Sequence, residues 1–333
     1  MMDIYIYNNT NYDVRARSSA GGLFSALAES TISRGGAVYG AAFDADWRIC
    51  HAHVDSIADL DSLRRSKYAF TDITTCFNQL TDDLASGRPL LVVGTPCQIA
   101  IIRKKFGERA NMLMVEVVCH GAPQPKYWDM YLDELLKSQG KNRADIASIN
   151  FRDKTEGWKN YSVRVDFKDG SQFIQNHRDN LYILAFVYDY TLRQGCSKCP
   201  YKYPNSKADI SMGDFWGIEV LAPEANNDLG TTIAIANTDK GTTVLSSLAD
   251  ATNLTVEEVA KYNPALIKAP NVPSDKPEFE AAVANEGFHS AASRFLKSVF
   301  DRRAKSTSLR SSAKHIIWCA YTYLTPKWLK RKI

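Results

Sequence analysis

The chain has 333 residues, of which 45% are hydrophobic and 23% are charged, and its formal net charge is +4. This composition is typical of a globular protein and excludes a disordered or fibrous one, and the net charge is too small to indicate a nucleic-acid-binding protein by itself. No apolar run approaches the length of a membrane span, and the first ten residues lack an export signal, so we expect a cytoplasmic protein. In that compartment the seven cysteines are expected to be free or metal-bound.

The first predicted elements are a strand, a helix and a second strand. Residues 1–12 predict a short leading strand, and apolar residues at helical spacing predict a helix over residues 18–34. Ser18 and Ser19 are expected to cap this helix. A pair of glycines ends it, and residues 37–43 follow as a strand.

A strand–helix–strand unit follows in the middle of the chain. Residues 89–93 read PLLVV between two glycines, which is typical of a strand buried on both faces. Pro96 suits the first turn of the helix predicted over residues 98–106. Residues 112–118 predict a second apolar strand. The two strands are therefore expected to be parallel and buried.

The remaining segments complete the expected fold. Residues 162–167 alternate in polarity and lead through a hairpin turn into residues 172–174, which predicts an antiparallel excursion. A helix is expected over residues 181–193 and a strand over residues 208–212, and residues 222–300 are expected to be helical. The predicted class is α/β, with a mixed, largely parallel sheet flanked by helices, the antiparallel excursion and a helical C-terminal region.

Four of the cysteines have the placement of metal ligands. Cys97 follows one predicted parallel strand and Cys119 ends the next, and ligands gather at the carboxyl ends of such strands. Cys196 and Cys199 form a C-x-x-C pair. Two plus two thiolates can hold an iron–sulfur cluster or a zinc ion. The other cysteines have no partner at such a spacing and are interpreted as structural: Cys50, Cys76 and Cys319.

These motifs, taken in order, resemble the coenzyme F420 hydrogenase/dehydrogenase beta-subunit family over about residues 13–220. The segments that carry the resemblance are RSSAGGLF (17–24), GGAVYGAAF (35–43), SKY (66–68), GTPCQ (94–98), CHG (119–121), FRDK (151–154) with Gly157-Trp158, C-x-x-C (196–199) and ADISMGDFWG (208–217). No single segment is specific, but the set is.

The resemblance implies an FAD-binding α/β domain beside a 4Fe–4S cluster. Its cysteine motifs match Cys97, Cys119, Cys196 and Cys199, which are therefore the expected cluster ligands. The flavin is expected over the serine–glycine helix start and the Ser-Lys-Tyr loop, where backbone N–H groups suit a pyrophosphate and a lysine supplies a cation. The expected cofactor-binding residues are Ser18, Ser19, Gly21, Gly22, Lys67, Thr95, Gln98 and His120. An ordinary capped helix is the plain alternative for the serine–glycine start.

Four regions are expected from the resemblance. Residues 13–84 are assigned to an N-terminal flavin-binding region and residues 85–220 to the cysteine-bearing domain. Residues 221–303 are expected to be a helical extension, and residues 304–333 form a basic, aromatic tail. That tail is a candidate for peripheral contact with the inner face of a membrane.

The chain departs from the family pattern in two places. Few residues precede the serine–glycine motif here and none is a cysteine, whereas many bacterial relatives have a ferredoxin-like module there. We therefore expect either a separate electron donor, such as a ferredoxin, or a truncated or specialised form of the chain. Arg65 stands where relatives often have glycine. Similar bacterial proteins are associated with surface-polysaccharide synthesis, which implies the same setting for this chain.

The leading hypothesis is an iron–sulfur flavoprotein oxidoreductase that passes electrons between the cluster and FAD. One alternative is a zinc-stabilised scaffold without catalysis, and another is a peripheral membrane component of a polysaccharide assembly complex. Among other side chains, Asp214 is a candidate for the site. Arg152 and Lys154 are interpreted as solvated charges, with contact to an anionic substrate as the alternative. Trp158 and Trp216 are interpreted as packing residues.

Overall fold

A computed structural model describes residues 3–298 and residue 301. The chain divides into two compact units, the first running through Lys276 and the second beginning at Pro277. The basic, aromatic tail and its Cys319 lie outside the described residues. No helix in the part that is described has the length and apolarity needed to cross a membrane.

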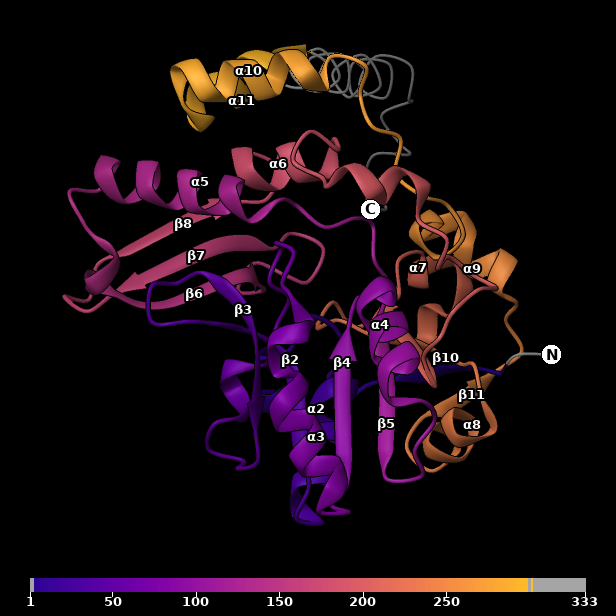
Figure 1. The fold of residues 1–333 in the computed structure, drawn as a ribbon. Coiled ribbons are helices and arrows are strands. Elements are labelled where there is room, and N and C mark those ends of the chain that lie inside the picture. The colour runs from indigo at the N-terminus through magenta and orange to yellow at the C-terminus, as the bar shows by residue number, and fades with distance from the viewer. Residues whose placement is uncertain (1–2, 299–300, 302–333) are drawn as a thin grey trace, which may run out of the picture. The chain divides into compact units, whose positions relative to one another are not determined.

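The first unit is built on a mixed sheet in the order β11-β1-β10-β9-β5-β4-β2-β3 (Figure 1). Its four central strands, β2, β4, β5 and β9, are parallel, and the strands on both sides of them are antiparallel. The predicted α/β class is confirmed, with the parallel pairing in the centre of the sheet. The strands are β1 (Ile4–Tyr7), β2 (Ala37–Phe43), β3 (Ile49–Val54), β4 (Leu90–Gly94), β5 (Met112–Val117), β9 (Ile210–Asp214), β10 (Thr232–Ala236) and β11 (Asp250–Thr252).

Helices cover both faces of this sheet because successive side chains of a strand point to opposite faces. In β2, Val38 belongs to the buried cluster that contains Leu27 of α2, whereas Tyr39 belongs to the cluster that contains Ile99 of α4. Every residue of β4 is buried, which explains why its sequence is apolar throughout. The covering helices are α2 (Leu23–Ser33), α3 (Phe77–Ala85), α4 (Pro96–Phe106), α7 (Ile218–Leu221), α8 (Asp239–Ser246) and α9 (Val256–Tyr262).

A second, antiparallel sheet confirms the predicted excursion. It consists of β6 (Ile146–Asp153), β7 (Ser162–Phe167) and β8 (Gln172–Asn176). Two helices, α5 (Pro125–Ser138) and α6 (Leu181–Val187), lie along it (Figure 1). The layers are joined by aromatic packing, since the ring of Trp128 lies 4.8 Å from that of Phe151 and 5.4 Å from that of Tyr182.

The remaining elements are short. Helix α1 precedes the serine–glycine loop, and α10 and α11 belong to the C-terminal part of the described chain, where Phe279 and Phe295 pack edge to face at 5.5 Å. Their bounds are α1 (Tyr12–Ala16), α10 (Lys276–Glu286) and α11 (Phe288–Phe295). The 3-10 helices are η1 (Leu60–Ser62), η2 (Ile73–Cys76), η3 (Arg143–Asp145), η4 (Gln194–Lys198), η5 (Pro223–Ala225) and η6 (Pro264–Leu266).

Three predicted elements differ from the structure. The helix expected from residue 18 begins at Leu23, because Gly22 has a left-handed backbone with φ of 90° that a right-handed helix cannot include. The helix expected over residues 181–193 ends at Val187. The region expected to be wholly helical after residue 222 contains β10 and β11, because β1 from the other end of the chain lies between these two strands and pairs with both.

Candidate functional site

A cavity of about 440 Å³ lies at the carboxyl ends of the parallel strands. Strands β4, β5 and β9 run in the same direction, so the residues that follow them meet at one edge of the sheet. Two further segments close the cavity, the loop over residues 18–24 and the stretch over residues 63–71. Its volume is in the range of small-molecule and cofactor sites.

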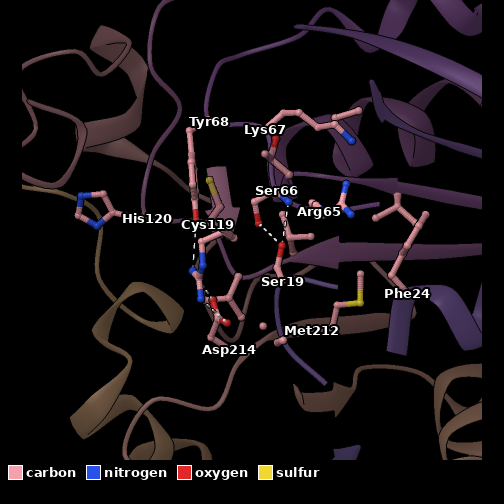
Figure 2. Close-up of a pocket in the computed structure, with 18 of the residues that line it drawn as sticks. Ser19, Phe24, Arg65, Ser66, Lys67, Tyr68, Cys119, His120, Met212 and Asp214 are labelled. Atoms are coloured by element: carbon pink, nitrogen blue, oxygen red, sulfur yellow. Dashed lines mark hydrogen bonds and ion pairs between the residues drawn. The ribbon is translucent and has the colours of Figure 1, made fainter. Parts of the chain in front are cut away.

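The walls of the cavity combine apolar and polar side chains. Phe24, Leu63 and Met212 supply apolar surface, and Tyr68 and Phe70 supply aromatic rings. Figure 2 shows the labelled side chains from separate segments of the chain gathered around this space. Such a mixture can enclose a planar ring system while polar groups fix its orientation.

The serine–glycine loop lies against the sheet edge. Ser18 is buried and its hydroxyl donates to the Val14 carbonyl at 2.7 Å. The prediction that Ser18 and Ser19 cap α2 was wrong, because Gly22 is the N-cap residue and no side chain caps the helix. The Ser19 hydroxyl lies 3.0 Å from that of Ser66 and accepts the Ser66 backbone N–H at 2.8 Å. This pair ties the loop to the 63–71 stretch.

The two glycines of this loop have different roles. A Cβ atom on Gly21 would lie 2.0 Å from the Tyr7 carbonyl oxygen, so only glycine fits beside strand β1. Gly22 has a φ of 90° and lines the cavity, whereas Gly21 does not line it. Of the eight expected cofactor-binding residues, Gly21 alone is outside the cavity wall.

Lys67 lines the cavity but is held by its own loop. Its Nζ donates to the Ser62 carbonyl at 2.7 Å and to the Arg64 carbonyl at 2.6 Å. Burial, reinforced by repulsion from Arg65, lowers the pKa of Lys67 to about 7. A nearby anion would therefore favour the charged amine.

Thr95 and Gln98 form a capping box at the start of α4. The Gln98 Oε1 accepts from the Thr95 N–H at 2.8 Å and from its hydroxyl at 3.0 Å. At its other end, the Gln98 Nε2 donates to the Thr71 hydroxyl at 2.9 Å, and that hydroxyl lies 2.5 Å from Nδ1 of His51. Both ends of the Gln98 amide are thus occupied within the cavity wall, which indicates a structural contribution from this side chain.

His120 lies on the opposite side of Tyr68 from Lys67 in Figure 2. Its Nε2 is 2.6 Å from the Asp189 carboxylate, and its ring meets Phe186 edge to face at 5.4 Å. These contacts fix the imidazole orientation at the cavity wall.

Arg152 and Asp214 form a buried ion pair in the same wall. Arg152 is only 3% exposed, and its Nη1 and Nη2 each lie 3.1 Å from an Asp214 oxygen. Burial disfavours the guanidinium cation, but attraction from Asp214 and from Tyr68 and Tyr161 outweighs this and raises the pKa of Arg152. The expectation of a solvated charge was wrong for Arg152, because β6 packs against the end of β9.

Lys154 is also withdrawn from solvent. Its Nζ donates to the carbonyls of Arg15 at 2.7 Å and Leu229 at 2.8 Å, beneath the serine–glycine loop. Burial, with repulsion from Arg152, lowers the pKa of Lys154 to about 8. The expectation of a solvated charge was wrong here too, since the Lys154 amine, just after β6, is held by these two carbonyls and also lies 3.4 Å from the Ala20 carbonyl of the serine–glycine loop.

The two tryptophans pack as expected. Trp158 is fully buried and its Nε1 donates to Asp214 at 2.9 Å. Its ring stacks on that of Trp216 at 4.9 Å with an interplanar angle of 3°. Trp216 also lines the cavity, so the stack supports the wall that contains Asp214.

Backbone pairing brings the two halves of the cysteine set together. Pro123 and Leu192 form an antiparallel bridge, and the Arg193 N–H donates to the Ala122 carbonyl at 3.0 Å. Beside this bridge the Ala122 N–H donates to the Cys196 sulfur at 3.4 Å. The segment after β5 and the C-x-x-C segment are therefore held next to each other.

The other three cysteines of the set influence Cys119 electrostatically. Burial is the main cause that raises the pKa of Cys119 to about 12. Cys97, Cys196 and Cys199 act in the same direction, and Lys202 opposes them. Within residues 3–298, no three His, Cys, Asp or Glu side chains lie close enough to hold a single metal ion.

Several side chains of the cavity were not among the predicted site residues. Ser66 and Tyr68 belong to the Ser-Lys-Tyr segment, so that motif could have pointed to them. Phe24 ends the RSSAGGLF segment, so that motif could have pointed to it as well, whereas His51 belongs to no such motif and only the tertiary structure places it at the cavity.

Comparisons with known proteins place the fold and the family. No curated protein matches the chain. A chain in a structure of the F420-reducing NiFe hydrogenase complex from Methanosarcina barkeri is similar, with 15% sequence identity and a TM-score of 0.53. The match covers 84% of this chain and 92% of that one, and it shows a shared fold.

A family model gives the more specific result. The model describes the C terminus of the coenzyme F420 hydrogenase/dehydrogenase beta subunit, and it matches residues 87–262, which is more than half of the chain. The matched residues include β4, β5 and β9 and all four cysteines of the predicted set. This family consists of subunits of oxidoreductases, so an oxidoreductase role is supported. The chain belongs to the coenzyme F420 hydrogenase/dehydrogenase beta-subunit family.

Proposed function

We propose that this protein is an iron–sulfur flavoprotein oxidoreductase that passes electrons between a 4Fe–4S cluster and FAD. The observation that carries the proposal is the position of Cys119. This residue lines the 440 Å³ cavity and also interacts electrostatically with Cys97, Cys196 and Cys199. A flavin in the cavity and a cluster on the thiols would therefore share one residue of the wall.

Two features near the thiols support the proposed cluster. Three cysteines from two other segments influence Cys119 electrostatically, and the Ala122 N–H donates to the Cys196 sulfur, a type of bond that tunes cluster potentials. Lys202 is only 8% exposed, and its Nζ donates to the carbonyls of Cys119 and Ala265. This buried cation would balance part of the negative charge of four thiolates.

The cavity fits a flavin. Phe24, Tyr68 and Phe70 supply ring surface, and the Ser19–Ser66 hydroxyl pair and Lys67 supply polar groups for a phosphate-bearing chain. When bound, the flavin supplies two-electron chemistry and the cluster supplies single-electron transfer. The chain's own contribution is to bind and orient the two groups and to keep water from the space between them.

The electron donor is proposed to be a separate protein such as a ferredoxin. The Methanosarcina barkeri neighbour is part of a hydrogenase complex, and this supports a protein partner for the present chain. A role in surface-polysaccharide synthesis and a contact of the tail with the membrane are proposed from the sequence motifs alone.

The proposal is tested by the spectrum and the metal content of anaerobically purified full-length protein. We expect flavin bands with a broad iron–sulfur shoulder, about four irons and as many sulfides per chain, and little zinc. A colourless protein with about one zinc per chain would refute electron transfer and support the scaffold alternative. Cys50→Ser is the matched control for replacing a ligand cysteine, since Cys50 lies on β3 and is outside the set of four.

A further inference from the structure

Arg65 has a backbone conformation that arginine rarely adopts. Its φ is 69°, in the left-handed region. Four non-glycine residues share this feature within the described chain, and two of them are aspartates, which tolerate it. The third is Trp47, whose N–H closes the turn onto the Asp44 carbonyl. Arg65 remains as a strained residue that lines the cavity. Backbone strain at such a position suggests a function for the side chain.

The guanidinium of Arg65 is poorly satisfied by the protein. Its Nε is buried and has no hydrogen-bond partner among the described residues. Its Nη1 is 3.6 Å from Asp61, a carboxylate that also lies 3.4 Å from Arg64 and 3.4 Å from Arg17. Arg64 also pairs with Glu29 at 2.7 Å, so two acids face three arginines and positive charge stays in excess at this end of the cavity.

Polar groups suited to an anion surround the Arg65 side chain. Figure 2 shows Arg65 beside Ser66 and Ser19, with Lys67 on the same side of the cavity. The Ser19 and Ser66 hydroxyls, 3.0 Å apart, can each donate to a ligand oxygen after a small rotation. A planar guanidinium fork and paired hydroxyls match the oxygens of a phosphate.

We infer that Arg65, with Ser19 and Ser66, forms a subsite for a phosphate or diphosphate group at this end of the cavity. The phosphate belongs to a nucleotide-type cofactor, or it is a free phosphate or diphosphate ion. The inference rests on the proposed flavin site and deepens it by naming a residue that sets its preference for phosphorylated ligands. The phosphate subsite can also be tested if the cavity binds a nucleotide other than FAD.

The experiment compares four proteins, the full-length wild type, Arg65→Gly, Arg65→Asn and Arg17→Ala. Glycine and asparagine both accept the left-handed backbone, so these variants should keep the fold and a thermal midpoint within a few degrees of wild type. Arg17 is the matched control because it pairs with the same Asp61 but does not line the cavity.

The probes are FAD, riboflavin, ADP and inorganic pyrophosphate, each titrated by calorimetry. Loss of a charge-assisted bond predicts at least about a tenfold weaker affinity of both Arg65 variants for FAD and pyrophosphate. Their affinity for riboflavin, which has no phosphate, should stay unchanged, as should every affinity of Arg17→Ala. Equal affinities of wild type and Arg65→Gly for pyrophosphate, ADP and FAD would overturn the inference.

The four probes also separate this inference from the proposed function. Absence of FAD and riboflavin binding, with pyrophosphate binding that depends on Arg65, would refute the flavin and leave the subsite intact. Binding of ADP but not of pyrophosphate would assign the subsite to a nucleotide rather than to a free ion. A similar loss in Arg17→Ala would show a general charge effect and overturn the role of Arg65.

Discussion

Replacing Asp214 with asparagine tests whether the buried Arg152 cation depends on its carboxylate partner. The Arg152 side chain is 3% exposed and that of Asp214 is 19% exposed, and two contacts of 3.1 Å join them. Removing one partner of a buried ion pair costs about 3–5 kcal/mol. Because Asp214 is partly open to the cavity, we expect about 3 kcal/mol, at the lower end of that range.

The expected loss in the free energy of unfolding is measured by urea and thermal unfolding. For a unit of this size about 2 °C of midpoint corresponds to 1 kcal/mol, so Asp214→Asn should lower the midpoint by about 6 °C. The matched control is Glu219→Gln, which breaks the exposed pair with Lys159, whose side chains are 49% and 38% exposed. This control should cost less than about 1 kcal/mol.

A double-mutant cycle isolates the interaction between the two side chains. Arg152→Met removes the cation that Asp214→Asn leaves without a charged partner, so the double variant should be more stable than additivity predicts by at least about 1.5 kcal/mol. If the two losses simply add, or if Asp214→Asn costs no more than Glu219→Gln, the argument from burial is wrong.

Three further perturbations have outcomes that follow from the structure. Gly21→Ala should cost about 2 kcal/mol or more, because its Cβ would meet backbone atoms at 2.0 Å and 2.6 Å, whereas Gly195→Ala, which has open space around it, should be nearly neutral in the same unfolding assay. Burial raises the pKa of Glu116 above 4.5. Between the pKa of the unfolded chain and the higher pKa of the folded protein, the folded protein keeps a proton that the unfolded chain has lost, so stability falls as pH rises through this range. Glu116→Gln should therefore gain stability relative to wild type as pH rises above 4.5, and a difference that does not change with pH would contradict this. Cys97→Ser should reduce the iron content from about four per chain, while Cys50→Ser should leave it unchanged, and equal iron in both would remove Cys97 from the ligand set.

The central part of the fold could be predicted from sequence because its signals are local. Strand β4 is apolar on both faces since helices cover both sides of it, and Pro96 marks the start of α4. Parallel pairing of β4 with β5 then brings Cys97 and Cys119 to the same edge of the sheet.

Other features depend on contacts that no local pattern encodes. Strand β10 is a short apolar run, and a run of this length is compatible with either a strand or a buried helix. Its partner in the sheet is β1, from the opposite end of the chain, so the neighbouring sequence does not identify it as a strand. The start of α2 is fixed by the left-handed Gly22, and glycine alone does not reveal its φ. Arg152 resembles a surface charge in the sequence. Its partner Asp214 belongs to a different sheet, so the sequence does not show that the two side chains meet.

The bridge between Pro123 and Leu192 has a consequence for assembly. Between these residues the chain leaves the main sheet to form α5, the β6–β8 sheet and α6. Cys119 and Cys196 lie at the base of this excursion, so a cluster bound to them would act as a cross-link across a long loop, worth about 4.5 kcal/mol by loop-closure entropy. Loss of the metal would then open the base of this loop first, and the β6–β8 layer would exchange its amide hydrogens faster than the parallel strands.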